Sequence, residues 1–231
     1  MDAKDVNLRQ LEAVASALGH LVAKVTFVGG STTVLLVDEA AHYGVRRTDD
    51  VDVIIDVATL AEYHSLSQEL RELRFREDTD GPICRWLVDT EIGSVKLDVM
   101  PINEKILGFS NRWYKDAIEQ AADIILPSGM TIRLVSPVHF LATKFEAFAG
   151  RGKGDYFSHD LEDVIFVMEN RTRLIMELMD SSEELKQYFA QQANLLLNDD
   201  FLNVLPGLLN DPNSAKSIEN SLNIMKSWLQ N

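Results

Sequence analysis

A strand–turn–helix pattern followed by an acidic strand is the feature that most constrains how this chain can fold. Residues 25–34 read Val-Thr-Phe-Val-Gly-Gly-Ser-Thr-Thr-Val, which predicts a short buried strand, a turn at Gly29 and Gly30, and a helix that begins at Ser31. Two glycines at such a turn let the backbone bend tightly and let a ligand approach it closely. The free N–H groups of the first helical turn, together with the Ser31 hydroxyl, form a candidate phosphate site.

The next segment, residues 47–56, carries carboxylates inside an otherwise apolar strand. Asp50 and Asp52 are two residues apart, so a strand places both on one face. A phosphate site beside two convergent carboxylates suits metal-assisted chemistry on a nucleoside triphosphate. Arg46 and Arg47 precede this strand, and two readings of them stay open. They can bind a phosphate through the guanidinium fork, or they can simply offset the neighbouring aspartates.

A third acidic position lies further along the chain. Residues 83–88 and 94–100 predict two strands of a hairpin, and Asp98 shares one face of the second strand with Lys96. If this strand neighbours the acidic strand, Asp98 can face Asp50 and Asp52. On its own, an aspartate in a strand is usually solvated.

Composition limits the partners that this chain can bind. Its 36 acidic and 22 basic residues give a net charge of −14, which argues against a broad, sequence-independent grip on nucleic acid. A local basic groove or a bound divalent cation remains compatible with this charge. No apolar run approaches the roughly 20 residues of a membrane span, so we expect no membrane association. The single cysteine, Cys84, excludes an internal disulfide and favours a buried structural thiol in a reduced, cytoplasmic setting.

The remaining pattern changes from mixed to helical near Ser136. Before that point, apolar spacing predicts helices over residues 7–22, from Ser31 to about His42, and from Thr59 onward. Residues 124–126 and 130–135 predict a hairpin around a Pro-Ser-Gly turn. We therefore expect an α+β fold with two domains: residues 1–135 form a small mixed β-sheet flanked by helices, and residues 136–231 form an all-helical C-terminal domain.

Two helices at the start of the second half carry charged side chains. Ser136 predicts an N-cap, with Pro137 in the first turn of a helix that includes Lys144. Residues 150–154 (Gly-Arg-Gly-Lys-Gly) end that helix in a basic, flexible loop. Ser158 then caps the next helix, whose first turns contain several acidic residues. Acidic residues are expected there from the helix dipole alone.

Taken in order, these motifs resemble the DNA polymerase β-like nucleotidyltransferases. The resemblance rests on Gly29-Gly30-Ser31, on Asp50-Val51-Asp52 and on Asp98 in its strand. The later segments 141–151 and 158–163 are similar to the second half of the AbiEii/AbiGii-type nucleotidyltransferase toxins. That family pairs a lysine on one helix with an aspartate at the start of the next, which match Lys144 and Asp160 here, with Asp163 as a near alternative. The similarity covers roughly residues 25 to 165.

The resemblance implies a mechanism and a set of ligands. It implies that Asp50, Asp52 and Asp98 bind Mg²⁺ or Mn²⁺, and that Lys144 and Asp160 complete the catalytic site. A nucleoside triphosphate, with ATP among the candidates, would be held by a further group of residues: Gly29, Gly30, Ser31, Arg47 and Thr48. The nucleoside monophosphate would pass to an acceptor and pyrophosphate would leave. Members of the family are often encoded beside an antitoxin and modify RNA or other targets, so a toxin with a cognate antitoxin and an RNA or protein acceptor is implied.

Two other functions stay open at this stage. The enzyme can act on a small molecule, and an acidic surface would suit a cationic aminoglycoside. Alternatively, the fold can serve as a catalytically silent nucleotide-binding or partner-binding module, against which the intact set of three aspartates argues. The acceptor and the preferred base do not follow from the sequence.

Overall fold

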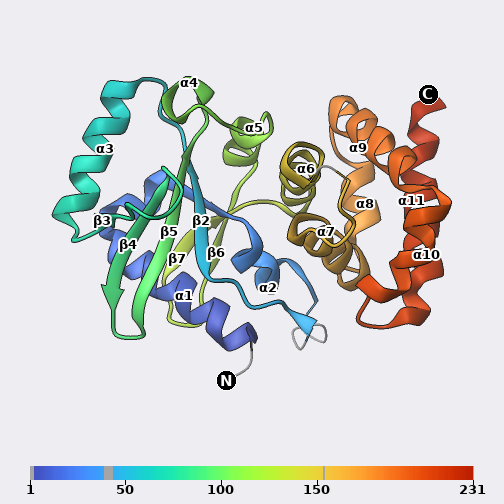
Figure 1. The fold of residues 1–231 in the computed structure, drawn as a ribbon, viewed down its shortest axis with the longest axis horizontal. Helices are drawn as coiled ribbons and strands as arrows, with labels where there is room; N and C mark the ends of the chain where they lie inside the picture. Colours follow the sequence, from blue (N-terminus) through green and yellow to red (C-terminus); the bar gives the residue numbers. More distant parts are fainter. Residues whose placement is uncertain (1–2, 39–43, 153, 231) are drawn as a thin grey trace.

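The computed structural model describes residues 3–38, 44–152 and 154–230 of the 231-residue chain. In the ribbon view, one mixed β-sheet with its surrounding helices occupies one side of the molecule, and a group of helices occupies the other (Figure 1). The sheet has seven strands in the order β3-β4-β5-β2-β1-β7-β6. The strands are β1 (Val25–Val28), β2 (Asp50–Ile55), β3 (Arg76–Glu77), β4 (Arg85–Thr90), β5 (Gly93–Pro101), β6 (Ala122–Ile125) and β7 (Thr131–Leu134).

Strand directions place the acidic strands at the centre of the sheet. Strand β2 pairs antiparallel with β1 on one side and parallel with β5 on the other. Strands β4 and β5 form the predicted hairpin, and β6 and β7 form the second one. Both hairpins are therefore confirmed. The two-residue strand β3, which pairs antiparallel with β4, was not predicted from the sequence.

Helices of the first half pack around this sheet. Helix α1 (Ala3–Leu18) is followed by a 3-10 helix over Gly19–Lys24, which leads into β1. Helix α3 (Leu60–Glu72) begins with a capping box, in which Thr59 and Glu62 satisfy each other's backbone N–H groups. Two short helices, α4 (Glu104–Leu107) and α5 (Tyr114–Glu119), fill a segment whose pattern predicted no element.

The helix predicted from Ser31 to about His42 is much shorter than expected. A 3-10 helix over Gly30–Thr32 continues as α2 (Thr33–Leu36), and Val37 is already extended. Tertiary hydrogen bonds replace the next helical turn: Asp38 N–H donates to the Asn170 carbonyl at 3.0 Å, and Arg171 donates to the Leu36 carbonyl at 2.7 Å. The predicted part beyond residue 38 falls on residues 39–43, which lie outside the described residues.

The second half is helical in the part of the chain that the structure describes, as predicted. Ser136 caps α6 (Pro137–Ala147), which continues as a π-helix over Phe148–Gly152, and Ser158 caps α7 (His159–Asn170). The remaining helices are α8 (Leu174–Met179), α9 (Glu183–Leu196), α10 (Asp199–Leu208) and α11 (Ala215–Ser227). Among the described residues, no helix is both long enough and apolar enough to cross a membrane.

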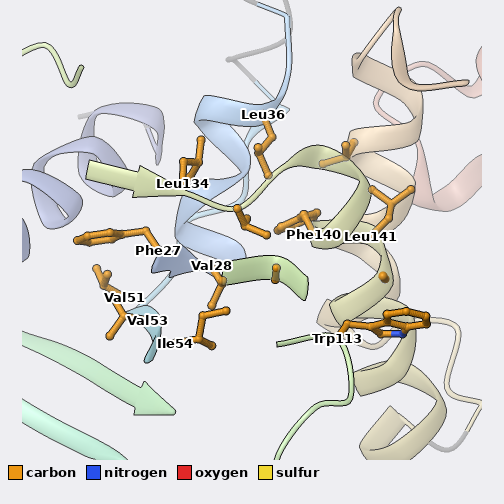
Figure 2. Close-up of a cluster of buried hydrophobic side chains, with 14 of the residues drawn as sticks. Phe27, Val28, Leu36, Val51, Val53, Ile54, Trp113, Leu134, Phe140 and Leu141 are labelled. Atoms are coloured by element: carbon orange, nitrogen blue, oxygen red, sulfur yellow. The ribbon is translucent and has the colours of Figure 1, made fainter. Parts of the chain in front are cut away.

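One hydrophobic core joins the sheet to the helices beside it. Phe27, Val53 and Leu134 come from the sheet, and Phe140 and Leu141 come from α6; all are buried in one continuous cluster (Figure 2). The burial of these side chains is the main force that fixes α6 against the sheet. As a consequence, residues on α6 and α7 can share a site with residues on β2.

Candidate active site

Parallel pairing of β2 and β5 brings the three predicted carboxylates together. Asp52 stands in register with Asp98, and Asp50 stands in register with Lys96. Side chains two residues apart lie on one face of a strand, and in-register partners on adjacent strands lie on the same face of the sheet. The three aspartates therefore form one cluster on that face.

Arg85 of β4 joins this cluster and holds two of its members. It stands opposite Asp98 in the antiparallel pairing. Its Nε and one terminal nitrogen each lie 2.8 Å from a different oxygen of Asp98, and the same terminal nitrogen lies 2.6 Å from Asp50. The hydrogen bonds to Asp98 raise the pKa of Arg85 above its usual value, and the charges of Asp98 and Asp50 add to this effect. Arg85 is thus a permanent cation between these carboxylates.

Asp52 has a different environment from its two neighbours. No hydrogen bond from the described residues reaches its carboxylate. Burial, and then the charge of Asp50, raise the pKa of Asp52 to about 7, with Asp98 adding to the shift and Lys144 opposing it. An acid whose pKa lies near neutrality can both bind a cation and exchange a proton. Among the described contacts, Asp52 is thus the member of the cluster that Arg85 leaves unpaired.

The Gly29-Gly30-Ser31 turn packs tightly beneath this cluster. Gly29 has a φ of 75°, and a Cβ atom there would lie 1.9 Å from Oδ2 of Asp52. A Cβ atom at Gly30 would meet Arg46 and Thr48 at 2.9 Å. The Ser31 side chain is fully buried, and its hydroxyl lacks a hydrogen-bond partner among the described residues. The Ser31 hydroxyl is thus inaccessible to a phosphate in this conformation.

A second charged cluster forms where α6 meets α7. The Lys144 ammonium lies 3.1 Å from Asp160 and 2.8 Å from Asp163, so both candidate aspartates contact the lysine. The Lys144 residue is only 9% exposed. Burial lowers the pKa of Lys144, but Asp163 and Asp160 more than compensate and raise it above the ordinary value. A buried, doubly paired lysine differs from the solvated lysine usually found in an amphipathic helix.

Two arginines complete this second cluster. Arg151, from the π-helix after α6, binds both oxygens of Asp160 at 2.6 and 2.8 Å. Residues 150–154 were predicted to form a flexible loop; residues 150–152 instead belong to the π-helix, and residue 153 lies outside the described residues. Burial raises the pKa of Asp160, but Arg151 and Lys144 hold it below its usual value. On the other side, Arg46 lies 3.3 Å from Asp163.

The segment before β2 is fixed by a side chain of α1. Asn7 is fully buried; its amide nitrogen donates to the Arg46 carbonyl at 2.9 Å, and its amide oxygen accepts from the Thr48 N–H at 3.1 Å. Arg47 between them is exposed, and Thr48 is buried. Arg46 pairs with Asp163 rather than with the aspartates next to it in sequence. Asn7 therefore sets the position at which the acidic strand begins.

A cleft of about 450 Å³ opens between the sheet and α6–α7. Four of the predicted site residues line it: Gly29, Asp52, Lys144 and Asp160. The other predicted residues do not line it: Gly30, Ser31, Arg47, Thr48, Asp50 and Asp98. Lining residues outside the predicted site set include Phe109, Tyr114 and Arg151. Aromatic and cationic side chains at the edge of such a cleft are suited to a base and a phosphate.

The donor chemistry of the three aspartates fits a divalent cation of the Mg²⁺ type, which prefers carboxylate oxygens. Burial, and then the charges of Asp50 and Asp98, raise the pKa of Asp52, and a bound cation would oppose this shift. As the side chains stand, no three His, Cys, Asp or Glu residues within the described ranges are arranged to hold an ion. Two of the three carboxylates are instead engaged by Arg85.

Sequence reasoning missed three residues of this region. Arg85 sits in a strand whose pattern predicted only a hairpin, and only the antiparallel register reveals its partner. Arg151 was placed in a loop, and Asn7 was hidden in an amphipathic helix. For Asn7, a polar residue at a core position of the helix is the one signal that the sequence offers.

Comparison with known proteins supports the fold and leaves the family open. No known family profile matches the sequence, and no curated protein matches it. Among solved structures, the chain is similar to that of an antigenic nucleotidyltransferase-like protein from Paracoccidioides brasiliensis, with a TM-score of 0.56 at 21% sequence identity. The match covers 87% of this chain and 92% of that one. This chain therefore has a nucleotidyltransferase-like fold, and its resemblance to the AbiEii/AbiGii-type toxins stays a prediction.

Proposed function

We propose that this protein is a nucleotidyltransferase that moves a nucleoside monophosphate from a nucleoside triphosphate to an acceptor. The observation that carries the proposal is the cleft that joins Asp52 on β2 to Lys144 and Asp160 on α6 and α7. These residues come from segments far apart in the chain, and a purely structural role would not require them to line one opening. The nucleotidyltransferase-like fold agrees with this assignment.

In this reaction an acceptor oxygen attacks the α-phosphorus, a new O–P bond forms, and the bond to the leaving pyrophosphate breaks. The acceptor proton passes to a base. Asp98 is a candidate base, but both of its oxygens accept hydrogen bonds from Arg85, which disfavours that role. Lys144 lines the cleft, and we assign it the role of opposing the negative charge that grows on pyrophosphate. A divalent cation, when bound, would neutralise the phosphates and lower their repulsion from the aspartates.

The acceptor that we propose is RNA or protein, and the biological role is that of a toxin with a cognate antitoxin. This part of the proposal rests on the similarity of residues 141–163 to the AbiEii/AbiGii-type toxins. The net charge of −14 disfavours a wide contact with RNA, so recognition would rely on the cationic residues near the cleft, such as Arg151. A small cationic acceptor is the alternative that the acidic surface favours.

One observation favours a second candidate function. Arg85 pairs with both Asp50 and Asp98, and such pairing would suit a nucleotide-binding module that lacks catalytic activity. The two candidates differ in what happens to the nucleotide. The module would bind it and release it unchanged.

Labelling separates these candidates. The protein is incubated with each α-³²P-labelled nucleoside triphosphate, Mg²⁺ or Mn²⁺, and cell extract, and the products are treated with ribonuclease or protease. We expect label in a macromolecule that one of the two treatments destroys, and no label with the Asp52→Asn variant. Label in a small cationic product would favour the alternative acceptor. Nucleotide binding without transfer, under every condition, would contradict the enzymatic assignment.

A further inference from the structure

The position of Arg85 has a consequence for cation binding. Arg85 is anchored by backbone pairing, because β4 and β5 hold it directly opposite Asp98. Its fork contacts both oxygens of Asp98 and one oxygen of Asp50, at distances of 2.6 to 2.8 Å. Charge-assisted, two-pronged contacts of this kind are among the strongest hydrogen bonds in proteins.

The pairing is also shielded from water. The side chains of Arg85 and Asp98 are 16% and 10% exposed, and that of Asp50 is 31% exposed. Low solvent exposure reduces the screening of these charges by water, so the contacts are stronger than those of surface ion pairs. By contrast, Asp52 receives no hydrogen bond from the described residues and faces the cleft. One carboxylate of the cluster is therefore free, and two are occupied.

A divalent cation and the guanidinium would compete for the same oxygens. Both are positively charged, so they also repel each other at close range. We propose that Arg85 is an internal counter-ion that occupies Asp50 and Asp98 and excludes a divalent cation from them until its side chain moves away. This inference rests on the proposed function, because it takes the three aspartates as the ligands of the cation.

A second acceptor for the displaced side chain lies close to its stem. The turn before β4 folds back so that the Asp78 N–H donates to the Arg85 carbonyl at 3.0 Å. A Cβ atom added at Gly81 would lie 2.6 Å from Oδ2 of Asp78 and 3.0 Å from Cδ of Arg85. The Asp78 carboxylate is thus near the Arg85 side chain and outside the cluster. In the proposal, the displaced guanidinium pairs with this carboxylate.

The test measures Mn²⁺ binding to the full chain by calorimetry and by electron paramagnetic resonance. The variants are Arg85→Gln, which removes the charge but keeps an amide, and Arg85→Lys, which keeps the charge but loses the fork. Arg76→Gln is the matched control, because Arg76 lies on the adjacent strand and pairs with Asp89 at 3.3 Å in an exposed contact. It removes the same charge away from the cluster.

We expect Arg85→Gln to bind Mn²⁺ at least about tenfold more tightly than the wild type, because a competing charge is lost. Arg85→Lys should fall between the two, and Arg76→Gln should match the wild type. The double variant Arg85→Gln/Asp50→Asn should lose the gain, which would assign the site. Without metal, Arg85→Gln should melt at a lower temperature than the wild type, and Mn²⁺ should restore part of the difference.

The other outcomes separate the inference from the proposed function. In one outcome, the wild type and both Arg85 variants bind Mn²⁺ with equal affinity, while Asp52→Asn loses binding. That result would overturn the inference and leave the enzyme assignment standing. If Arg85→Gln does not fold, the Arg85→Lys affinity alone decides, and equality with the wild type again overturns the inference. Absence of Mn²⁺ binding in every variant would overturn both. Tighter binding in Arg85→Gln without nucleotide transfer would support the inference and contradict the proposed function.

Discussion

The carboxylate of Asp52 packs directly against the backbone of Gly29, so that a Cβ atom at Gly29 would lie 1.9 Å from Oδ2 of Asp52. This contact couples the glycine turn to the acidic strand. It explains why a glycine is required at this position for two independent reasons: the positive φ of 75° and the absence of space.

The Gly29→Ala variant should therefore be destabilised and should also displace Asp52. Backbone strain alone costs about 1–3 kcal/mol, and the clash adds to it. Chemical denaturation measures the loss in the free energy of unfolding. Gly129→Ala is the control, because Gly129 has a φ of 86° but open space around it; it should lose less. Equal losses in the two variants would show that the contact with Asp52 is unimportant.

The raised pKa of Asp52 predicts a dependence of stability on pH. Its pKa is 3.8 in the unfolded reference and about 7 in the folded protein, so the folded state binds the proton more tightly. The stabilising contribution of the protonated group is complete below pH 4 and is lost as the pH rises through 7. Asp52→Asn should therefore match the wild type near pH 4 and be more stable at pH 8, by on the order of 1–3 kcal/mol.

Thermal melting across this pH range, without metal, checks the Asp52 prediction. Asp50→Asn is the matched control, because Asp50 is paired with Arg85 at 2.6 Å and its loss breaks an ion pair instead of relieving repulsion. That variant should not gain stability at pH 8. If the difference in stability between the wild type and Asp52→Asn is the same at pH 4 and at pH 8, the raised pKa of Asp52 is refuted.

Lys144→Ala should cost both stability and turnover. The substitution removes the partner that Asp160 and Asp163 share in a buried site, while Arg151 and Arg46 still pair with them. The loss in stability should therefore stay below the roughly 3–5 kcal/mol of an uncompensated buried charge. Turnover, measured on folded protein at low temperature, should fall by about 10²–10³ because a preorganised charge is lost. Nucleotide affinity should fall much less, since the charge on pyrophosphate develops only in the transition state.

Lys115→Ala provides the control for Lys144→Ala, because Lys115 is an exposed lysine that lies 4.0 Å from Glu119 within one helix. Its substitution should change the free energy of unfolding by less than about 0.5 kcal/mol. Unchanged turnover in folded Lys144→Ala would remove this residue from the catalytic site. A stability loss without a turnover loss would assign Lys144 a purely structural role.

Asn7→Ala should loosen the start of the acidic strand. The change leaves the Thr48 N–H and the Arg46 carbonyl without their buried partner, and each unsatisfied group costs about 1–3 kcal/mol. Hydrogen exchange should show faster exchange at the Thr48 amide. Asn223→Ala, an exposed asparagine that donates only to a carbonyl in its own helix, should leave stability nearly unchanged. Unchanged, slow exchange at the Thr48 amide in Asn7→Ala would show that Asn7 does not fix the start of the acidic strand.

Local patterns in the sequence were sufficient to predict most of the regular elements. The capping signals at Thr59, Ser136 and Ser158 are local hydrogen-bonding devices, and the corresponding helices begin at the next residue in each case. The two hairpins likewise follow from alternating patterns and turn residues. One exception, the helix after Gly30, ends early because of bonds to residues more than 130 positions away. No local pattern carries that information.

For the candidate site, the sequence by itself determined which residue types are present and which of them share a strand face. Asp50 and Asp52 must lie on one face because the period of a strand is two, and the charged residues near Lys144 and Asp160 follow from helix spacing. Only the tertiary structure decided the partners. Parallel pairing of β2 with β5 placed Asp98 beside Asp52, the register of β4 placed Arg85 between two carboxylates, and core packing of α6 placed Lys144 in the cleft. Contacts between distant segments depend on strand register and side-chain packing, which a local sequence pattern cannot encode.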